Sequence, residues 1–218
     1  MNPENPAPPD QENDLERRLA ESEAARAELE KKVAELEART KTLEDQNEAL
    51  EKQVGRDALT GLYNRFGFNE QMAREFSLAK RDTGRFVGLL LIDVNDFKKI
   101  NDTLGHPVGD KALCLVAKVL SGSVRESDSV CRLGGDEFAI ILREPLNADS
   151  PKIIAERIAA ALAAKPLVEG EQTVPLTLSI GGIAAADSTI EQLYQEGDKN
   201  LYAAKAKKSE GGSPVVCG

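Results

Sequence analysis

Apolar residues in the N-terminal part of the chain recur at alternating steps of three and four. Between about Glu12 and Val54 the sequence contains no Gly or Pro, and the apolar positions that follow this spacing are Leu15, Leu19, Leu29, Val33, Leu36, Leu43, Leu50 and Val54. This spacing is the heptad repeat, in which the a and d positions line one side of a helix. The pattern predicts a coiled coil over residues 12–54.

The residues that flank the heptad positions favour a parallel dimer. With the central leucines at d, Lys32 and Arg39 fall at g and would face Glu37 and Glu44 of a partner chain. Asn47 falls at an a position, where it can pair with its own copy only if two chains align in register. We therefore expect a parallel homodimer, and the alternative is a single solvated helix stabilised by i,i+4 ion pairs.

Beyond Gly55 the heptads give way to short apolar runs alternating with amphipathic stretches. Strands are expected at 86–93, at 177–184 and, as two short strands around Gly134-Gly135, at 130–142. Helices are expected from the end of the segment 57–65 to about 80, and at 108–121, 151–165 and 190–208. This alternation predicts an α/β or α+β domain with one central sheet.

The domain plan follows from these patterns. Four prolines among the first ten residues predict a disordered tail over 1–11, followed by the coiled coil at 12–54. One catalytic domain is expected at 55–210, and a flexible C-terminus at 211–218.

Composition excludes several classes of partner. A net charge of −9 without a dense basic cluster argues against nucleic acid. Three cysteines and one histidine at unrelated spacings indicate neither a disulfide framework nor a zinc site, which favours a reducing cytoplasm. The longest apolar run, 86–92, is too short to span a bilayer, so no membrane partner is expected.

Three carboxylates are candidates for a metal site. Asp93 ends an apolar strand, while Asp136 and Glu137 directly follow Gly134-Gly135. Taken separately, the aspartate fits a helix N-cap and the glycines a hairpin turn. Carboxylates brought together from two strand ends repel one another, and an oxygen-preferring divalent cation compensates them. We expect Mg²⁺, with Mn²⁺ as the alternative ion.

A nucleotide is expected to bind at the same site as this metal. The strand that ends at Asp93 leads into a helix, so backbone N–H groups near Asp96, Phe97 and Lys98 are placed to hold phosphates. The chain contains no Walker A sequence, so any nucleotide must be held by another device. The residues alone thus predict a Mg²⁺-nucleotide site, without identifying the base or the reaction.

Several ordered motifs carry a resemblance to a known family. Residues 93–110, Asp-Val-Asn-Asp-Phe-Lys-Lys-Ile-Asn-Asp-Thr-Leu-Gly-His-Pro-Val-Gly-Asp, are accompanied by Asp-Ala-Leu-Thr-Gly-Leu-Tyr-Asn-Arg at 57–65, Gly-Gly-Asp-Glu-Phe at 134–138 and Leu-Ser-Ile-Gly at 178–181. This set resembles the GGDEF family of diguanylate cyclases over roughly Asp57 to Lys205. The resemblance implies a nucleotidyl-cyclase-like domain with a central, mainly antiparallel sheet flanked by helices.

The resemblance also implies a reaction and its metal ligands. Two GTP molecules would be joined into cyclic di-GMP with release of two pyrophosphates, across a dimer in which each domain holds one GTP. Metal ligands are implied at Asp93, the Val94 carbonyl and Asp136, with Glu137 on a second ion. Asp136, Glu137 and Lys98 form the implied catalytic set, with Asp136 as the candidate base.

The implied substrate contacts are equally specific. Asn101 and Asp110 would read the guanine edge, because a carboxylate accepts hydrogen bonds that guanine donates and adenine does not in that arrangement. Lys98 and Lys205 would contact the phosphates, and the backbone of Asn95, Asp96 and Phe97 would line them. Gly134 and Gly135 are also implied to contact the substrate.

A product-binding inhibitory site is implied by Arg125-x-x-Asp128, nine residues before Gly134, together with Arg157. By itself Arg-x-x-Asp usually marks a surface ion pair. Ser209 and Glu210 depart from the family pattern, which has a basic residue at position 209. This departure raises an alternative, a weakly active module that serves as a dimeric receptor for cyclic di-GMP or GTP, or as a scaffold.

Overall fold

The computed structural model describes residues 9–81, 85–145, 147–170, 172–186, 188–209 and 214–218. The chain divides into two compact units, Met1–Leu50 and Glu51–Gly218. Among the helices of the described ranges, none combines the length and the apolar character needed to cross a lipid bilayer.

Helix α1, Pro9–Val54, is a continuous helix of 46 residues. It begins before the expected start at residue 12, so the tail predicted over 1–11 is wrong for residues 9–11; residues 1–8 lie outside the described ranges. The N–H groups of the first helical turn have no partner within the helix. Pro9, which has no N–H group, therefore costs no hydrogen bond there.

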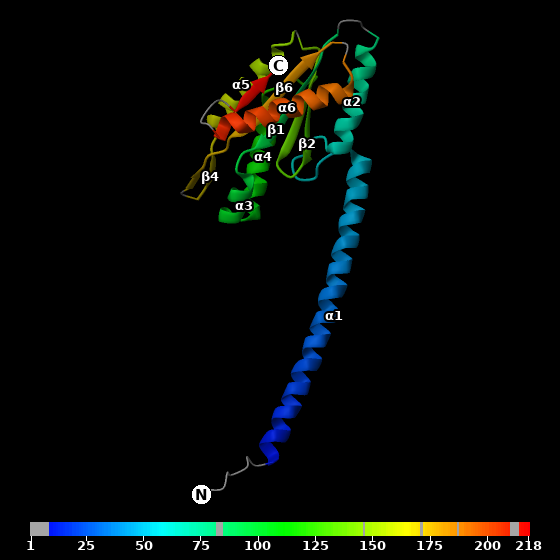
Figure 1. Cartoon of the computed structure of the whole chain (residues 1–218), viewed down its shortest axis with the longest axis vertical. Helices are drawn as coiled ribbons and strands as arrows, with labels where there is room; N and C mark the ends of the chain where they lie inside the picture. Colours follow the sequence, from blue (N-terminus) through cyan, green and yellow to red (C-terminus); the bar gives the residue numbers. More distant parts are fainter. Residues whose placement is uncertain (1–8, 82–84, 146, 171, 187, 210–213) are drawn as a thin grey trace. The chain divides into compact units, whose positions relative to one another are not determined.

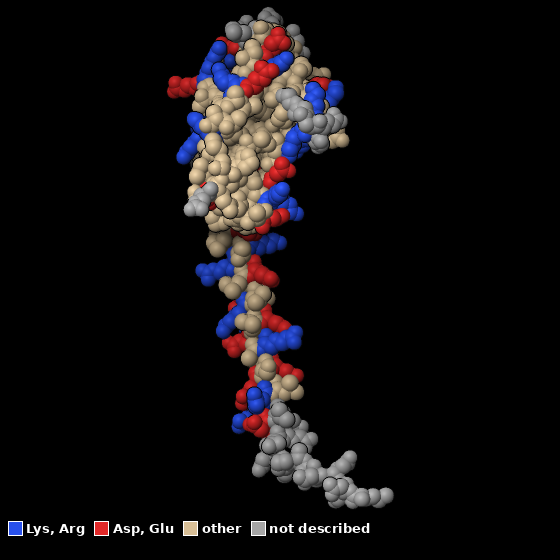
Figure 2. Space-filling view, turned by 90° about the vertical axis from the view of Figure 1, so that its left-hand side faces the viewer, with Lys and Arg blue, Asp and Glu red and all other residues tan. Residues whose placement is uncertain are grey.

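Apolar side chains of α1 are exposed in the single chain. Leu29 and Leu36 are both 64% exposed, and Lys/Arg and Asp/Glu side chains alternate along the helix (Figure 2). Ion pairs one turn apart include Arg26–Glu30 at 2.9 Å and Lys32–Glu28 at 3.0 Å. The ion pairs suit either a solvated helix or a coiled coil, and the row of exposed leucines leaves the coiled coil a prediction that agrees with the structure.

The second unit is built on a five-stranded sheet in the order β2-β3-β1-β6-β7. Its strands are β1 Val87–Val94, β2 Ser129–Gly134, β3 Glu137–Arg143, β6 Leu178–Ala185 and β7 Val215–Cys217. All neighbouring strands are antiparallel except β6 and β7. The mainly antiparallel central sheet is therefore confirmed.

Helices cover both faces of this sheet (Figure 1). Phe68 and Met72 of α2, Arg65–Ala79, and Leu193 of α6, Ile190–Ser209, pack in one core cluster. The opposite cluster includes apolar residues of α4, His106–Gly122, and α5, Ser150–Ala163. In β1, Leu89 and Leu91 belong to the first cluster, whereas Leu90 and Ile92 belong to the second. The strand is therefore buried on both faces, and Asp93 is the one charged residue in it.

Smaller elements complete the unit. Helix α3, Phe97–Leu104, follows β1 and is separated from α4 by Gly105, whose positive φ of 84° breaks the helix. A hairpin of β4, Leu167–Glu169, and β5, Gln172–Val174, was not expected, because its strands are only three residues long.

The C-terminus corrects one expectation. Residues 211–218 were expected to be flexible, yet Val215–Cys217 forms β7 beside β6. The Ile180 N–H donates to the Pro214 carbonyl at 2.8 Å, and the Gly218 N–H to the Gly182 carbonyl at 3.2 Å. The apolar triplet Val-Val-Cys thus covers an otherwise open sheet edge, and residues 210–213 lie outside the described ranges.

Candidate active site

The end of β1 and the turn between β2 and β3 meet at one edge of the sheet. Asp93 is the register partner of Glu137, and the Val94 N–H donates to the Asp136 carbonyl at 3.1 Å. Gly134 pairs with Glu137, so the turn consists of Gly135, with a positive φ of 51°, and Asp136. The structure therefore brings the backbones of the three predicted acidic residues together, as the sequence suggested.

Lysines of α6 reach two acidic residues of this edge. Lys205 Nζ lies 2.7 Å from Asp93 Oδ2, and Lys208 Nζ lies 2.6 Å from Asp96 Oδ2. Helix α6 thus supplies positive charge to the segment that joins β1 to α3. Lys208 stands next to position 209, where the family pattern has a basic residue; Glu210 lies outside the described ranges.

The carboxylates do not form a ready-made ligand cage. Within the described ranges, no three His, Cys, Asp or Glu side chains are arranged to hold a metal ion. Asp93 is instead neutralised by Lys205, and Glu137 lies 3.7 Å from Arg65. The donor types still fit a hard cation, because all three side chains offer carboxylate oxygens at one sheet edge.

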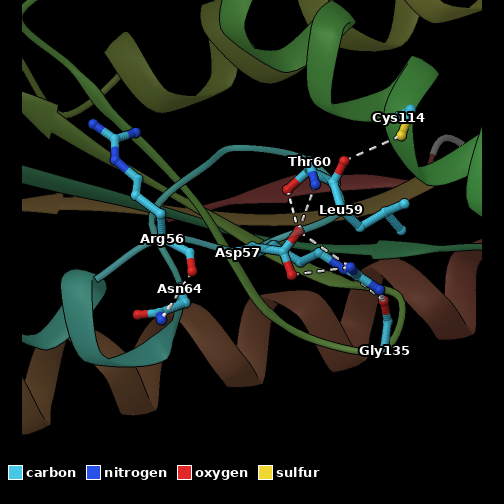
Figure 3. Close-up of polar contacts among 8 residues, drawn as sticks. Arg56, Asp57, Leu59, Thr60, Asn64, Cys114 and Gly135 are labelled. Atoms are coloured by element: carbon cyan, nitrogen blue, oxygen red, sulfur yellow. Dashed lines mark hydrogen bonds and ion pairs between the residues drawn. The ribbon is translucent and has the colours of Figure 1, made fainter. Parts of the chain in front are cut away.

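An arginine fixes the turn that carries Asp136. Arg132 donates to the Gly135 carbonyl from Nε at 3.1 Å and from Nη2 at 2.8 Å, while its Nη1 lies 3.2 and 3.1 Å from the two carboxylate oxygens of Asp57. Asp57 also accepts from the backbone N–H and hydroxyl of Thr60 (Figure 3). Asp57, at the start of the segment 57–65, thus holds Arg132 in the position from which it bonds the turn. Neither Asp57 nor Arg132 was assigned a role from the sequence.

Asn95 serves the structure through its side chain. It is 7% exposed, its amide donates to Thr177 Oγ1 at 3.0 Å, and its Oδ1 accepts from the Ser179 hydroxyl at 2.7 Å. The next residue, Asp96, has a positive φ of 57° just before α3 begins. Buried hydrogen bonds therefore hold the strand-to-helix connection in the conformation that presents the first N–H groups of α3.

The predicted guanine-reading residues lie on neighbouring helices. Asn101 is on α3 and Asp110 is on α4, and these helices pack against each other. Asn101 Oδ1 is buried without a hydrogen-bond partner among the described residues. A Cβ at Gly109 would lie 1.9 Å from this oxygen, so glycine is needed to leave Asn101 in place. An unsatisfied amide oxygen on α3 and an exposed carboxylate on the adjacent α4 are groups that can accept hydrogen bonds from a polar base edge.

Arg125, Asp128 and Arg157 are brought together at a separate place. They line one cavity of about 150 Å³ together with Arg143 and residues of α5. The two carboxylate oxygens of Asp128 accept from the backbone N–H groups of Arg125 and Arg143, each at 3.0 Å. Asp128 thus fixes the turn that carries Arg125.

Comparison with known proteins identifies the family. The family model described as "Diguanylate cyclase, GGDEF domain" matches residues 54–211. The chain belongs to the GGDEF family. It is 42% identical over 156 residues to "Response regulator PleD" of Caulobacter vibrioides, covering 69% of this chain and 34% of that protein. To "Diguanylate cyclase DgcS" of Shewanella oneidensis it is 35% identical, covering 69% of this chain and 49% of that one. The chain thus spans half or less of these relatives.

Solved structures of GGDEF proteins share the fold. A structure of "the coiled coil and GGDEF domain of DgcB from Caulobacter crescentus in complex with c-di-GMP" matches with a TM-score of 0.65 and 26% identity, covering 87% of this chain and 98% of that one. "Diguanylate cyclase SiaD in complex with its activator SiaC" from Pseudomonas aeruginosa matches with a TM-score of 0.63 and 30% identity, covering 90% of this chain and 76% of that one.

Proposed function

We propose that the chain is a diguanylate cyclase that condenses two GTP molecules into cyclic di-GMP. The observation that carries this proposal is the meeting of Asp93 and the Gly135-Asp136 turn at one sheet edge, beside lysines of α6. Acidic groups beside lysine ammonium groups suit the transfer of a nucleotidyl group, which needs a metal ion and cations that bind phosphate. Family membership supports the same reaction.

The proposed substrate site extends from the sheet edge to α3 and α4. Asn101 and Asp110 would hold the guanine edge, and Asp110 would favour GTP over ATP because it accepts from guanine N1–H and the exocyclic amine. Backbone N–H groups of residues 95–97, with Lys98 and Lys205, would receive the phosphates. Both lysines are exposed and within reach of solvent-borne anions.

A divalent cation, with Mg²⁺ as the first choice and Mn²⁺ as the alternative, is proposed at Asp93, the Val94 carbonyl, Asp136 and Glu137. When bound, such an ion polarises a phosphate and lowers the pKa of a nearby hydroxyl. The chain's own contribution is positional. Arg132 fixes the turn through its bonds to the Gly135 carbonyl. In the proposed reaction Lys205, which contacts Asp93, would bind a phosphate, and Asp136 would accept the proton of the attacking hydroxyl.

Dimerisation through α1 is part of the proposal. One domain supplies one GTP site, whereas the product joins two nucleotides, so two domains must face each other. The exposed leucines of α1 and the inferred parallel register would hold two domains at high local concentration. A relative of known structure, DgcB, was crystallised with a coiled coil and a GGDEF domain.

Product inhibition is proposed at the cavity lined by Arg125, Asp128 and Arg157. Arginine guanidinium groups bind phosphates in a bidentate manner and stack on flat bases, so cyclic di-GMP suits this lining. The DgcB structure contains bound c-di-GMP, which supports recognition of this ligand within the family.

The main test is turnover of GTP by the purified protein. Incubation with GTP and Mg²⁺ should yield cyclic di-GMP, and Asp136→Asn should abolish it. Arg125→Ala should relieve inhibition by added cyclic di-GMP while leaving the initial rate unchanged. Lack of product from the nucleotide-free dimer at every protein concentration would refute the cyclase proposal.

The second candidate function is a receptor that binds cyclic di-GMP with turnover near background. The observation in its favour is Ser209, which stands where the family has a basic residue. Tight binding of cyclic di-GMP that survives Asp136→Asn, together with a parent rate close to that of Asp136→Asn, would favour the receptor over the enzyme.

A further inference from the structure

A cavity of about 520 Å³ lies between α3 and the β4–β5 hairpin (Figure 1). Its lining comes from one face of α3, from β5 and from the residues that follow β5 as far as Thr177. We call it the α3 cavity. Asn101 and Asp110, which are proposed to hold the guanine edge, lie outside this lining. The volume of the α3 cavity falls in the range of small-molecule sites.

The α3 cavity and the predicted guanine-reading amide lie on different faces of α3. Residues three or four positions apart share a helix face, and the α3 residues that line the cavity are Lys99, Ile100, Thr103 and Leu104. Asn101 is directed instead toward α4, where a Cβ at Gly109 would meet its Oδ1. A ligand in the α3 cavity would therefore contact α3 from the side opposite to the proposed substrate.

The walls of the α3 cavity are held in place by contacts outside it. The Asn95 N–H donates to the Thr177 carbonyl at 2.9 Å, and the Asn95 amide donates to Thr177 Oγ1 at 3.0 Å. The hairpin is tied to α4, because Lys111 Nζ lies 2.7 Å from both carboxylate oxygens of Glu169. A cavity whose walls are already positioned loses little conformational entropy when a ligand binds.

The deepest part of the α3 cavity is apolar. Ile100 is 8% exposed and Val174 is 7% exposed, and Leu104 packs beside them against the same core cluster. Asn95 is also buried, but its amide group is already bonded to Thr177 and Ser179. An apolar floor between a helix and a strand suits a flat hydrophobic group such as an aromatic ring.

One charged group at the rim of the α3 cavity lacks a partner. Asp96 is neutralised by Lys208, whose Nζ lies 2.6 Å from it. Lys99 is exposed, and within the described ranges its ammonium group makes no ion pair. The hydroxyl groups of Thr103 and Thr173 make no hydrogen bond to described residues either. The rim thus offers one positive charge and two hydroxyl donors, which match a single carboxylate.

We propose that the α3 cavity binds a small molecule with a flat apolar body and one carboxylate. The apolar body would lie on Ile100 and Val174, and the carboxylate would pair with Lys99. A nucleotide triphosphate suits this lining poorly, because it carries several negative charges and the lining supplies one unpaired cation. This binding claim does not depend on the proposed cyclase activity.

Naphthoate is a suitable probe, and naphthylmethanol is its uncharged counterpart. Methyl NMR of the full chain, isotope-labelled at Ile, Leu and Val, reports where each compound binds. Naphthoate should shift the methyl signals of Ile100, Leu104 and Val174 in a saturable manner. Naphthylmethanol should shift the same signals with weaker affinity, because it lacks the charge that pairs with Lys99.

Lys99→Ala separates the carboxylate contact from the apolar contact. It should weaken naphthoate binding by about three- to tenfold, the range for an accessible charged contact, and leave naphthylmethanol binding unchanged. Lys118→Ala is the matched control, because it removes an exposed lysine of α4 that lies outside the cavity. Thr103→Phe should fill the cavity and weaken both compounds, and position 103 is exposed, so the domain should still fold.

Four results would overturn the proposal. Shifts centred on Ile153 and Ile154 would place the anion in the cavity lined by Arg125, Asp128 and Arg157. Shifts centred on Leu29 and Leu36 would reveal adsorption to the exposed leucines of α1. Equal losses in Lys99→Ala and Lys118→Ala would indicate diffuse charge attraction. Undiminished binding of both compounds to Thr103→Phe would show that they do not occupy the α3 cavity.

Discussion

Arg132 links Asp57 to the backbone of the turn that precedes Asp136. One guanidinium group bonds both Asp57 carboxylate oxygens and, twice, the Gly135 carbonyl. Arg132 and Asp57 are only 13% and 17% exposed, so solvent screens their interaction weakly. The position of the turn therefore depends on a group outside the catalytic set.

Arg132→Lys should separate this positioning from charge. A lysine ammonium keeps the charge but cannot match the planar fork that serves Asp57 and Gly135 together. We expect kcat to fall by about tenfold and stability by about 1–2 kcal/mol, as for loss of charged hydrogen bonds. Steady-state kinetics and urea unfolding measure the two effects.

Arg85→Lys is the matched control for this variant. Arg85 is also mostly buried, 16% exposed, and paired with the carboxylate of Glu75, but it lies at the far end of β1 from Asp93. It should lose comparable stability with kcat unchanged. An equal fall of kcat in both variants would contradict a specific role for Arg132.

Gly109→Ala should weaken GTP binding although it replaces no polar side chain. The added methyl group would meet Asn101 Oδ1 at 1.9 Å and the Phe97 ring at 3.3 Å, so Asn101 must move. We expect the KM for GTP to rise by about tenfold, the typical effect of losing a base-edge contact. Gly122→Ala on the same helix is the control, because its Cβ meets nothing within 4 Å. Similar KM values for the two variants would remove Asn101 from guanine recognition.

Periodicity was enough to predict the large elements, because each is long or strongly apolar. β1 is buried on both faces, and α1 carries leucine or valine at most of the a and d positions between Leu29 and Val54, so both stand out in the sequence. The strands of β7 and of the β4–β5 hairpin are three residues long, too short to show a period. β7 forms by pairing with the edge of β6, a tertiary contact that local sequence does not show.

The site was predictable in its acidic residues but not in its supports. Asp93 attracts attention because it ends an apolar strand, where a charge is costly, and Asp136 because it and Glu137 are adjacent carboxylates directly after two glycines. The Arg132–Asp57 contact joins residues 75 positions apart, and nothing local in the sequence announces that pairing. The same holds for the pairing of Lys208 with Asp96, which are 112 positions apart.

Lys208→Ala tests whether this lysine compensates for Ser209. Lys208 is 34% exposed on its side chain and contacts Asp96 beside the N-terminus of α3. If it also serves the phosphates, its removal should raise the KM for GTP by about three- to tenfold, the range for an accessible charged contact. Lys207→Ala is the control, since Lys207 is exposed and lacks an ion-pair partner within the described ranges. Equal KM values for Lys207→Ala and Lys208→Ala would show that Lys208 does not replace the basic residue that the family has at position 209.

Leu36→Lys tests the proposed dimer. Leu36 is a d position and 64% exposed in the single chain, so a charge there would be buried at the interface of a coiled coil. We expect a monomer by light scattering and loss of most cyclase activity at micromolar protein. Ala38→Lys, at the outward f position, introduces the same side chain and should remain dimeric and active. Full activity in a monomeric Leu36→Lys protein would contradict the two-domain active site.

Cys131 should make stability fall at alkaline pH. Burial of this thiol in the sheet raises its pKa from 9.0 to about 12, because the thiolate is poorly solvated there. The folded state therefore keeps a proton that the unfolded state releases above pH 9, so the contribution of this thiol is full below pH 9 and is lost as the pH rises toward 12. Between pH 8 and 10 the parent should lose about 1.4 kcal/mol more than Cys131→Ala. Urea unfolding of both proteins at the two pH values measures this difference, which also cancels the titration of Cys217, and parallel pH profiles would show that the thiol ionises equally in both states.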